Sequence, residues 1–339
     1  MFRGSIAAAL TLGAALALGG CGQTTTPASE PESAAPQAGG GCEGVTSSTG
    51  PVTLTDAYGR TVELEKPAER VAVLEWQQTE ALLTLCVSPV AVADPKGFAT
   101  WVSAEELPEG TTDVGTRGEP NLEALFATNP DLIVVEAYTA EDEILKQLAE
   151  YDVPVLATKG ADAKDPIANM KDTFTWIAQA AGREERAKEV IGEFDAKLAQ
   201  AREAISGTDA AATDFVYFDG WIDGANVAIR PFGQGSLMGE LGEEIGLKNA
   251  WTGDVDPAYG LGQTDIEGMT QVGDATFFYT GTVDPAGDVN AELAKNTVWQ
   301  SIPAVAEESA HAFPEGIWTF GGPKSAGQVI DAYVALLTK

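Results

Sequence analysis

The chain has 339 residues, enough for two ordinary domains, and its 44% hydrophobic content is typical of a soluble globular protein. Its 51 acidic and 20 basic residues give a formal net charge of −31. A negative field of this size repels polyanions, which argues against nucleic acid, heparin and anionic lipid surfaces as partners.

The first 20 residues predict a bacterial lipoprotein signal peptide. Arg3 is their only charged residue, and the apolar run over 5–19 is too short to span about 30 Å of hydrocarbon. The run ends in Leu18-Gly19-Gly20-Cys21, which resembles the lipobox at which signal peptidase cuts before a cysteine that becomes acylated. The alternative is an ordinary signal peptide followed by a chance cysteine. We expect lipid on Cys21 to attach the protein to the membrane.

Residues 21–50 predict a flexible tether. They consist mainly of Thr, Ser, Pro, Gly and Glu, and they have almost nothing apolar to bury. Burial therefore cannot offset the entropy cost of ordering them. About 30 residues of flexible chain reach on the order of 30 Å, which suits a domain that docks beside a membrane.

The remaining cysteines, Cys42 and Cys86, then lie in an oxidising compartment. We predict that they form a disulfide that staples the tether to the folded part, the alternative being two unrelated thiols. Together with the single histidine, His311, they are too few for a zinc or iron site of the usual nitrogen and sulfur kind. We therefore predict no metal site and no cofactor.

From residue 51 onward the sequence predicts an α/β fold. Short β-branched runs alternate with helical periodicity, which is typical of parallel sheets with crossover helices. Strands are predicted at 71–76, 89–94, 131–136, 154–158, 215–220, 227–230, 275–281 and 311–313. Helices are predicted near 77–86, 121–129, 140–151, 166–181, 235–246, 289–296 and 324–338.

One long amphipathic helix is predicted at mid-chain, over 183–205. Its apolar residues recur at steps of three and four and form one stripe, while polar residues cover the rest. A helix of this length spans about 35 Å, roughly one domain diameter. We interpret 183–206 as a rigid strut between two lobes, 51–182 and 207–339. The alternative is a crossover helix within one large sheet.

Several motifs resemble the periplasmic siderophore-binding family. The segments DAYGRTV at 56–62 and PAERV at 67–71 are similar to the start of the family's folded domain. Its iron-dicitrate and hydroxamate branch resembles this chain at VLEW (73–76), PVAVAD (89–94), VGTRGEPNLE (114–123), NPDLI (129–133) and WTFGGPKSA (318–326). The similar segments follow one another in the family's order over about 51–339. One departure is Cys86, where relatives typically turn with Gly, and it supports a disulfide particular to a subgroup.

The resemblance implies the class III solute-binding protein fold: two Rossmann-like α/β lobes joined by a single long helix, with little closure on binding. It implies a monomeric, extracytoplasmic protein that binds a ferric siderophore between the lobes and delivers it to an ABC permease and its ATPase. The alternative ligands are haem and cobalamin. A lipid-anchored hydrolase or a cell-envelope adhesion module is a weaker alternative, because one histidine and no G-x-S-x-G motif argue against an enzyme.

Candidate ligand-binding residues follow the predicted strands, because ligands of open α/β sheets bind outside the carboxyl ends of the strands. Glu75 and Asp219 occupy such positions. Tryptophan and tyrosine offer a large contact area, and arginine donates paired hydrogen bonds to the oxygens bound to iron. The alternatives are core tryptophans and arginines paired with neighbouring acids. We predict that the ligand is bound by Trp76, Arg117, Tyr138, Trp221, Arg230, Phe232, Tyr259 and Trp318.

Two glutamates are candidates for docking onto the permease. Glu123 lies in the segment PNLEAL and Glu267 in DIEGM, each at a predicted helix start in its own lobe. The resemblance implies that a glutamate at each of these places meets permease arginines. The alternative is that acids simply favour helix N-termini.

Overall fold

The computed structural model describes residues 41–224 and 226–338. The predicted signal peptide, Cys21 and the tether up to residue 40 lie outside the described residues. Across the described ranges, none of the helices combines the length and the apolar character that crossing a membrane requires.

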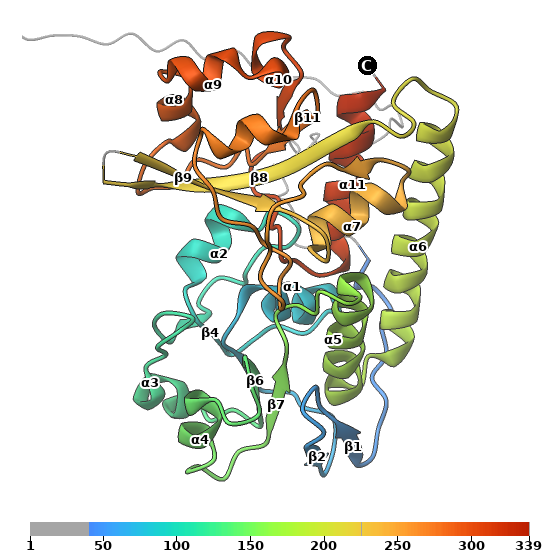
Figure 1. Ribbon diagram of the computed structural model, residues 1–339. Helices are drawn as coiled ribbons and strands as arrows, with labels where there is room; N and C mark the ends of the chain where they lie inside the picture. The colour runs from blue at the N-terminus through green and yellow to red at the C-terminus, as the bar shows by residue number, and fades with distance from the viewer. Residues whose placement is uncertain (1–40, 225, 339) are drawn as a thin grey trace, which may run out of the picture. The chain divides into compact units, whose positions relative to one another are not determined.

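Five parallel strands form the sheet of the N-terminal half, in the order β5-β4-β3-β6-β7. This half of the chain occupies the lower part of Figure 1. Their apolar residues are buried, as expected for a parallel sheet covered on both faces. The strands are β3 (Val71–Val73), β4 (Ala91–Val92), β5 (Thr112–Asp113), β6 (Leu132–Glu136) and β7 (Val155–Thr158). The helices are α1 (Trp76–Thr84), α2 (Pro95–Trp101), α3 (Leu122–Ala127), α4 (Glu143–Leu148) and α5 (Pro166–Ala181). An antiparallel ribbon of β1 (Val52–Thr55) and β2 (Thr61–Leu64) adds to the same core. We call this part the N-terminal lobe.

The C-terminal lobe contains a second sheet in the order β10-β8-β11-β12, with β9 antiparallel to β8. The long strand β8 pairs with β10 over its first two residues and with β9 from Tyr217 onward. The strands are β8 (Asp214–Asp223), β9 (Asn226–Phe232), β10 (Lys248–Asn249), β11 (Thr276–Tyr279) and β12 (Ala310–Ala312). The helices are α7 (Leu237–Glu244), the 3-10 helix η1 (Gly268–Val272), α8 (Val289–Leu293), α9 (Thr297–Ser301), α10 (Pro303–Ala306) and α11 (Pro323–Leu337).

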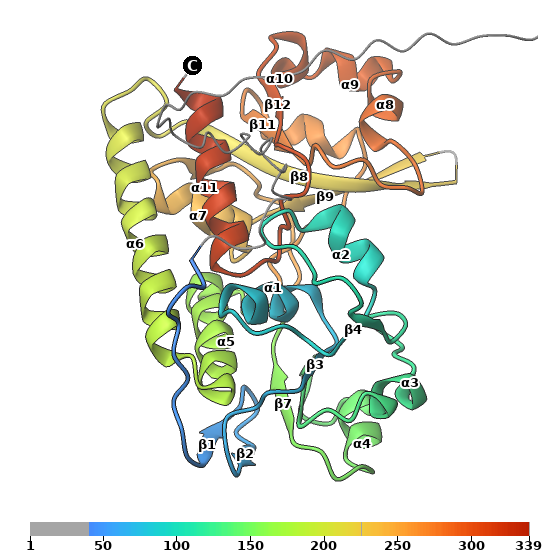
Figure 2. The ribbon, with the colours of Figure 1, turned by 180° about the vertical axis from the view of Figure 1, so that it is seen from behind.

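The long helix α6 (Glu184–Ser206) contributes side chains to the cores of both lobes. Ala187 and Val190, near its start, belong to the core around β3 and α1. Phe194 and Ile205, further along, belong to the core around β8 and α11. Figure 2 shows α6 running beside both α5 and α11. Because one rigid helix is buried in two cores, it holds the two sheets at a fixed spacing.

The predicted elements agree best where the hydrophobic pattern is long. Helix 166–181 coincides with α5, and helix 183–205 differs from α6 by one residue at each end. The predicted strand 71–76 is too long, because Trp76 begins α1 instead of ending a strand. The strand at 227–230 is part of a hairpin with β8, not a parallel strand reached through a helix. The sequence analysis missed short elements with little periodicity, namely β1, β2, α2, β5, β10, η1, α9 and α10.

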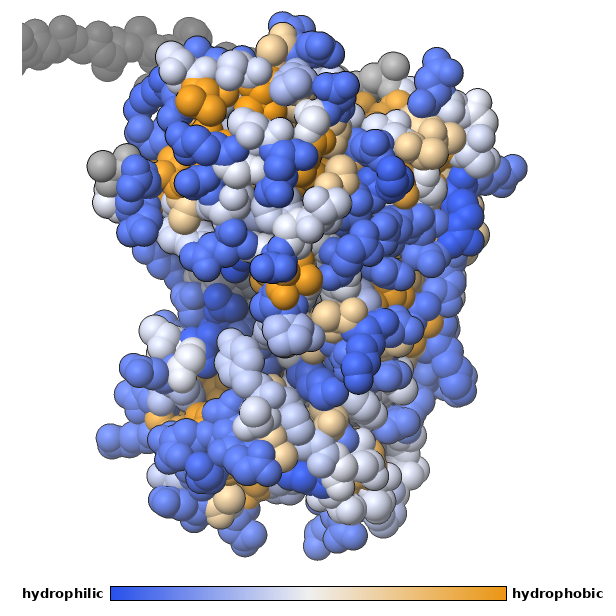
Figure 3. All heavy atoms as spheres, viewed as in Figure 1, coloured by the Kyte–Doolittle hydropathy of each residue, from blue (hydrophilic) through white to orange (hydrophobic). Residues whose placement is uncertain are grey.

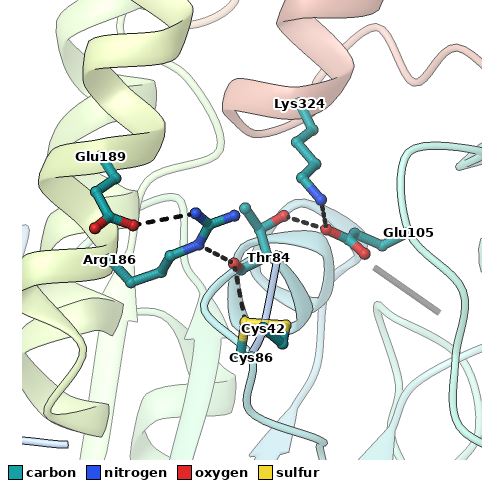
Figure 4. Close-up of a disulfide and its surroundings, with 7 residues drawn as sticks. All are labelled: Cys42, Thr84, Cys86, Glu105, Arg186, Glu189 and Lys324. Atoms are coloured by element: carbon teal, nitrogen blue, oxygen red, sulfur yellow. Dashed lines mark hydrogen bonds and ion pairs between the residues drawn. A yellow bond between two sulfur atoms is a disulfide. The ribbon is translucent and has the colours of Figure 1, made fainter. Parts of the chain in front are cut away.

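The predicted disulfide between Cys42 and Cys86 is confirmed, with Cα atoms 5.6 Å apart. Figure 4 shows it just beyond the end of α1, beside Thr84. Cys86 has a φ of 63°, in the left-handed region that glycine adopts most easily. The disulfide therefore ties the segment before β1 to the turn that ends α1.

Candidate ligand-binding cleft

Two adjoining cavities lie between the lobes, at the carboxyl ends of both sheets. The first has a volume of about 330 Å³ and the second about 400 Å³, and both are lined by Arg117, Arg230 and Trp318. We call them together the cleft. A third cavity of about 610 Å³ continues into the N-terminal lobe and shares Arg117 with the other two. Figure 3 shows a recess between the region of β8 and β9 and the region of α3 and α4. These volumes are typical of pockets for small organic ligands.

Arg117 is held by a carboxylate and by an indole ring. Its loop is closed by a β-bridge between Gly115 and Pro120. Its Nη1 donates to Glu75 Oε1 at 2.6 Å, and its guanidinium lies 3.7 Å from the centre of the Trp76 ring. Glu75 is the N-cap of α1, so the helix start fixes the carboxylate that Arg117 meets. Arg117 therefore pairs with Glu75, which lies far from it in the sequence.

Arg230 is paired within the β8–β9 hairpin. It stands opposite Asp219 in the strand register, and its Nε and Nη2 donate to the two Asp219 carboxylate oxygens at 2.8 and 2.6 Å. Such two-bond pairing is the strongest arrangement open to an arginine and a carboxylate. Burial raises the pKa of Asp219 even though the guanidinium opposes this. The hairpin therefore fixes the guanidinium in the wall of the cleft.

Glu136 and Tyr259 form a hydrogen bond across the floor of the cleft. Glu136 is the last residue of β6, and it accepts from the Tyr259 hydroxyl of the opposite lobe at 2.6 Å. A Cβ on Gly160 would come within 2.3 Å of both oxygens, so glycine leaves room for the contact. Burial, and secondly the charge of Glu75, raise the pKa of Glu136 to about 7. The cleft floor therefore holds a carboxyl group that titrates near neutral pH.

The structure places seven of the eight predicted ligand-binding residues on the cleft. Trp76 and Trp318 pack edge to face, with ring centres 4.8 Å apart, and Tyr138 and Trp221 are 75% and 41% exposed. Phe232 is a correction, because it is fully buried. It packs against Tyr217 and Phe320 beneath the surface, so it supports Arg230 from behind. The seven lining residues are Trp76, Arg117, Tyr138, Trp221, Arg230, Tyr259 and Trp318.

Sequence reasoning missed Glu136. Its position as a carboxylate at the end of a predicted apolar strand could have indicated it. The prediction named Tyr138, two residues later, instead. Phe320 also lines the cleft, two residues beyond Trp318. Among the described residues, no three His, Cys, Asp or Glu side chains come together in a way that could hold a metal ion.

Polar contacts join the lobes behind the cleft. The buried Glu80 of α1 accepts from the backbone N–H and the hydroxyl of Ser325 in α11, at 3.0 and 2.5 Å. Gln77 donates to the Gly321 carbonyl, also across the lobes. Lys324 pairs with Glu105 at 2.5 Å, as Figure 4 shows. These contacts, together with α6, oppose a large change in the angle between the lobes.

The two candidate docking glutamates are both exposed. Glu123 lies in the first turn of α3, as predicted. Glu267 differs from the expectation, because it precedes the five-residue 3-10 helix η1 and makes no side-chain cap. The two lobes therefore present these carboxylates on different backbone structures.

The chain belongs to the periplasmic binding protein family, whose pattern matches residues 71–310. It is 28% identical to the iron(3+)-hydroxamate-binding protein FhuD of Escherichia coli, over 76% of this chain and 83% of that protein. It is 26% identical to the probable siderophore-binding lipoprotein YfiY of Bacillus subtilis, over 82% of this chain and 85% of that one.

A solved structure shares the fold. The crystal structure of the siderophore-binding protein FhuD from Vibrio cholerae, bound to Fe³⁺–Desferal, matches with a TM-score of 0.69. The match covers 79% of this chain and 97% of that one, at 22% sequence identity. The predicted α/β architecture of the class III solute-binding proteins is thereby confirmed.

Proposed function

We propose that this protein binds a ferric siderophore in the cleft and delivers it to an ABC importer. The observation that carries the proposal is the cleft itself. It lies between the sheets of the two lobes, which α6 holds apart, and it is lined by aromatic rings and two arginines. Aromatic faces suit a bulky, partly apolar chelate, and fixed polar groups orient it. The printed names of relatives in the same family, as hydroxamate- and siderophore-binding proteins, support this assignment.

The proposal includes the place where the protein works. Lipid on Cys21 would hold a monomer at the outer face of a membrane. The residues between Cys21 and Cys42 would give it reach, since Cys42 is tied to the N-terminal lobe by the disulfide. The lipoproteins among its relatives support this arrangement. Mass spectrometry of the membrane fraction tests it, since an acylated Cys21 must be the first residue of the exported chain.

Titration with iron chelates tests the binding. Trp76 and Trp318 line the cleft, so a ferric chelate bound there should quench tryptophan fluorescence. Calorimetry should show binding of at least one ferric siderophore and no tight site for free Fe³⁺, Zn²⁺ or Mn²⁺. Micromolar or tighter affinity for a free ion, with no chelate bound, would refute the proposal.

Delivery is assigned to the exposed pair Glu123 and Glu267. Replacing both with alanine should leave chelate affinity intact and sharply reduce uptake by cells. The matched control is Glu185→Ala with Glu292→Ala, two exposed first-turn acids that already pair with lysines. Normal uptake in the first double variant, or an equal loss in the control, would reject the assignment.

A further inference from the structure

The cleft is lined by more acidic than basic side chains. Among its lining residues, all of them described, the cations are Arg117 and Arg230 alone. Five acidic side chains face them. They belong to Glu75, Glu136, Asp219, Asp284 and Asp288.

Both arginines are already paired with acids of the protein. Arg230 directs two donors at Asp219, and the pair is only partly exposed, at 32% and 16%. Arg117 contacts Glu75 at 2.6 Å and is 33% exposed. A guanidinium paired in this way has lost much of its attraction for an anion, because its partner repels the same anion. An anionic chelate would have to displace these internal pairs.

We infer that the ligand is a ferric chelate without net negative charge, neutral or cationic, as in the tris-hydroxamate class. Three hydroxamates neutralise a ferric ion, whereas three catecholates leave a trianion. A neutral or cationic chelate leaves both internal pairs intact, and the acidic lining of the cleft does not repel it. The inference rests on the proposed function, and it names the chemical class that the same cleft selects.

Three chelates with one iron centre provide the test. Ferric desferrioxamine B carries a free amine and is cationic, its N-acetyl derivative is neutral, and its N-succinyl derivative is anionic. We expect the protein, purified from the full-length chain, to bind the cationic and neutral forms about tenfold or more tightly than the anionic form. The preference should shrink as salt rises, because part of the interaction is screened.

Three variants locate the preference in the cleft. Glu75→Gln keeps the acceptor for the Trp76 N–H but removes the charge that neutralises Arg117. It should raise affinity for the anionic form and reduce the preference about threefold to tenfold. Glu136→Gln, a second variant, should act in the same direction. The control Glu63→Gln removes one charge from the exposed face of β2, and it should leave the preference unchanged.

The results distinguish failure of the charge preference from failure of siderophore binding itself. An anionic form that binds as tightly as the cationic one overturns the inference and leaves siderophore binding standing. A control variant that shifts the preference as much as Glu75→Gln also overturns it, because the overall charge and not the cleft would then be responsible. If no ferric chelate of any charge binds, the proposed function and the inference both fail.

Discussion

The two lobes each present one arginine to the cleft, but they hold it in different ways. Arg117 lies on a loop, contacts one oxygen of Glu75 and stacks on Trp76. Arg230 lies within a strand, opposite Asp219 in the register, and uses two donors. A loop residue held by one bond can turn toward a ligand at small cost. A strand residue held by two bonds cannot, so we expect Arg230 to shape the wall and Arg117 to adjust to the ligand.

Removing the carboxylate partner of each arginine should show this difference most clearly. Asp219→Ala leaves Arg230 partly buried and unpaired, and should lower the free energy of unfolding by about 3 kcal/mol. Glu75→Ala should cost only about 1 kcal/mol, because Arg117 can turn into solvent. Urea denaturation of both variants measures the difference, with Asp219→Asn as the milder control. Equal losses would show that the two arginines are held alike.

The disulfide provides a second contrast, since the described part of the C-terminal lobe has no counterpart. It closes a separation of 44 residues, so its loss should cost about 4 kcal/mol. Cys86 has a positive φ, which alanine tolerates poorly and glycine well. Cys42→Ala with Cys86→Gly should therefore be more stable than Cys42→Ala with Cys86→Ala by about 1 kcal/mol. Thermal unfolding of the two pairs checks this. Equal stability would mean that the turn relaxes once the sulfur bond is gone.

The pH dependence of stability compares the buried acids that the two lobes contribute to the cleft. The carboxyl of Glu136 faces Glu75, Arg117, Gln78 and Tyr259, and burial raises its pKa from the ordinary 4.5 to about 7. The folded protein therefore holds a proton that the unfolded chain has released between these values. Stability should fall as pH rises from about 4.5 through 7, by about 3 kcal/mol in all. Burial raises the pKa of Asp219 as well, so the C-terminal lobe adds a slope of the same sign.

The variant Glu136→Gln isolates the contribution of this group. The free energy of unfolding of this variant should depend less on pH between about 4.5 and 7 than that of the wild type. The contribution of Asp219 to the pH dependence should remain. Denaturation of the variant and the wild type at a series of pH values between 4 and 8 measures the difference. Parallel curves would show that Glu136 is ionised throughout the window.

The fold class, the long helix, the disulfide and seven residues that line the cleft could be predicted from the sequence alone. Each depends on information carried along the chain. The stripe on α6 is long enough to establish a period, and the strands of an α/β sheet place the residues that follow them at one edge. Short elements such as β10 and α2 have too few residues to establish a period. They form because of strand pairing or a helix cap, so they were not predicted.

The pairing of the cleft residues could not be predicted from the sequence, because it depends on how the elements pack. That Arg230 meets Asp219 depends on the register of a hairpin, and that Arg117 meets Glu75 depends on where α1 begins. The bond from Glu136 to Tyr259 joins residues 123 positions apart in the chain. Phe232 was misplaced for the same reason, since a strand's two faces differ in burial only once the neighbouring elements are packed. Composition and periodicity report which residues a chain has and which face they share. The partner of a charged group is set by distances of a few ångströms, which packing alone fixes.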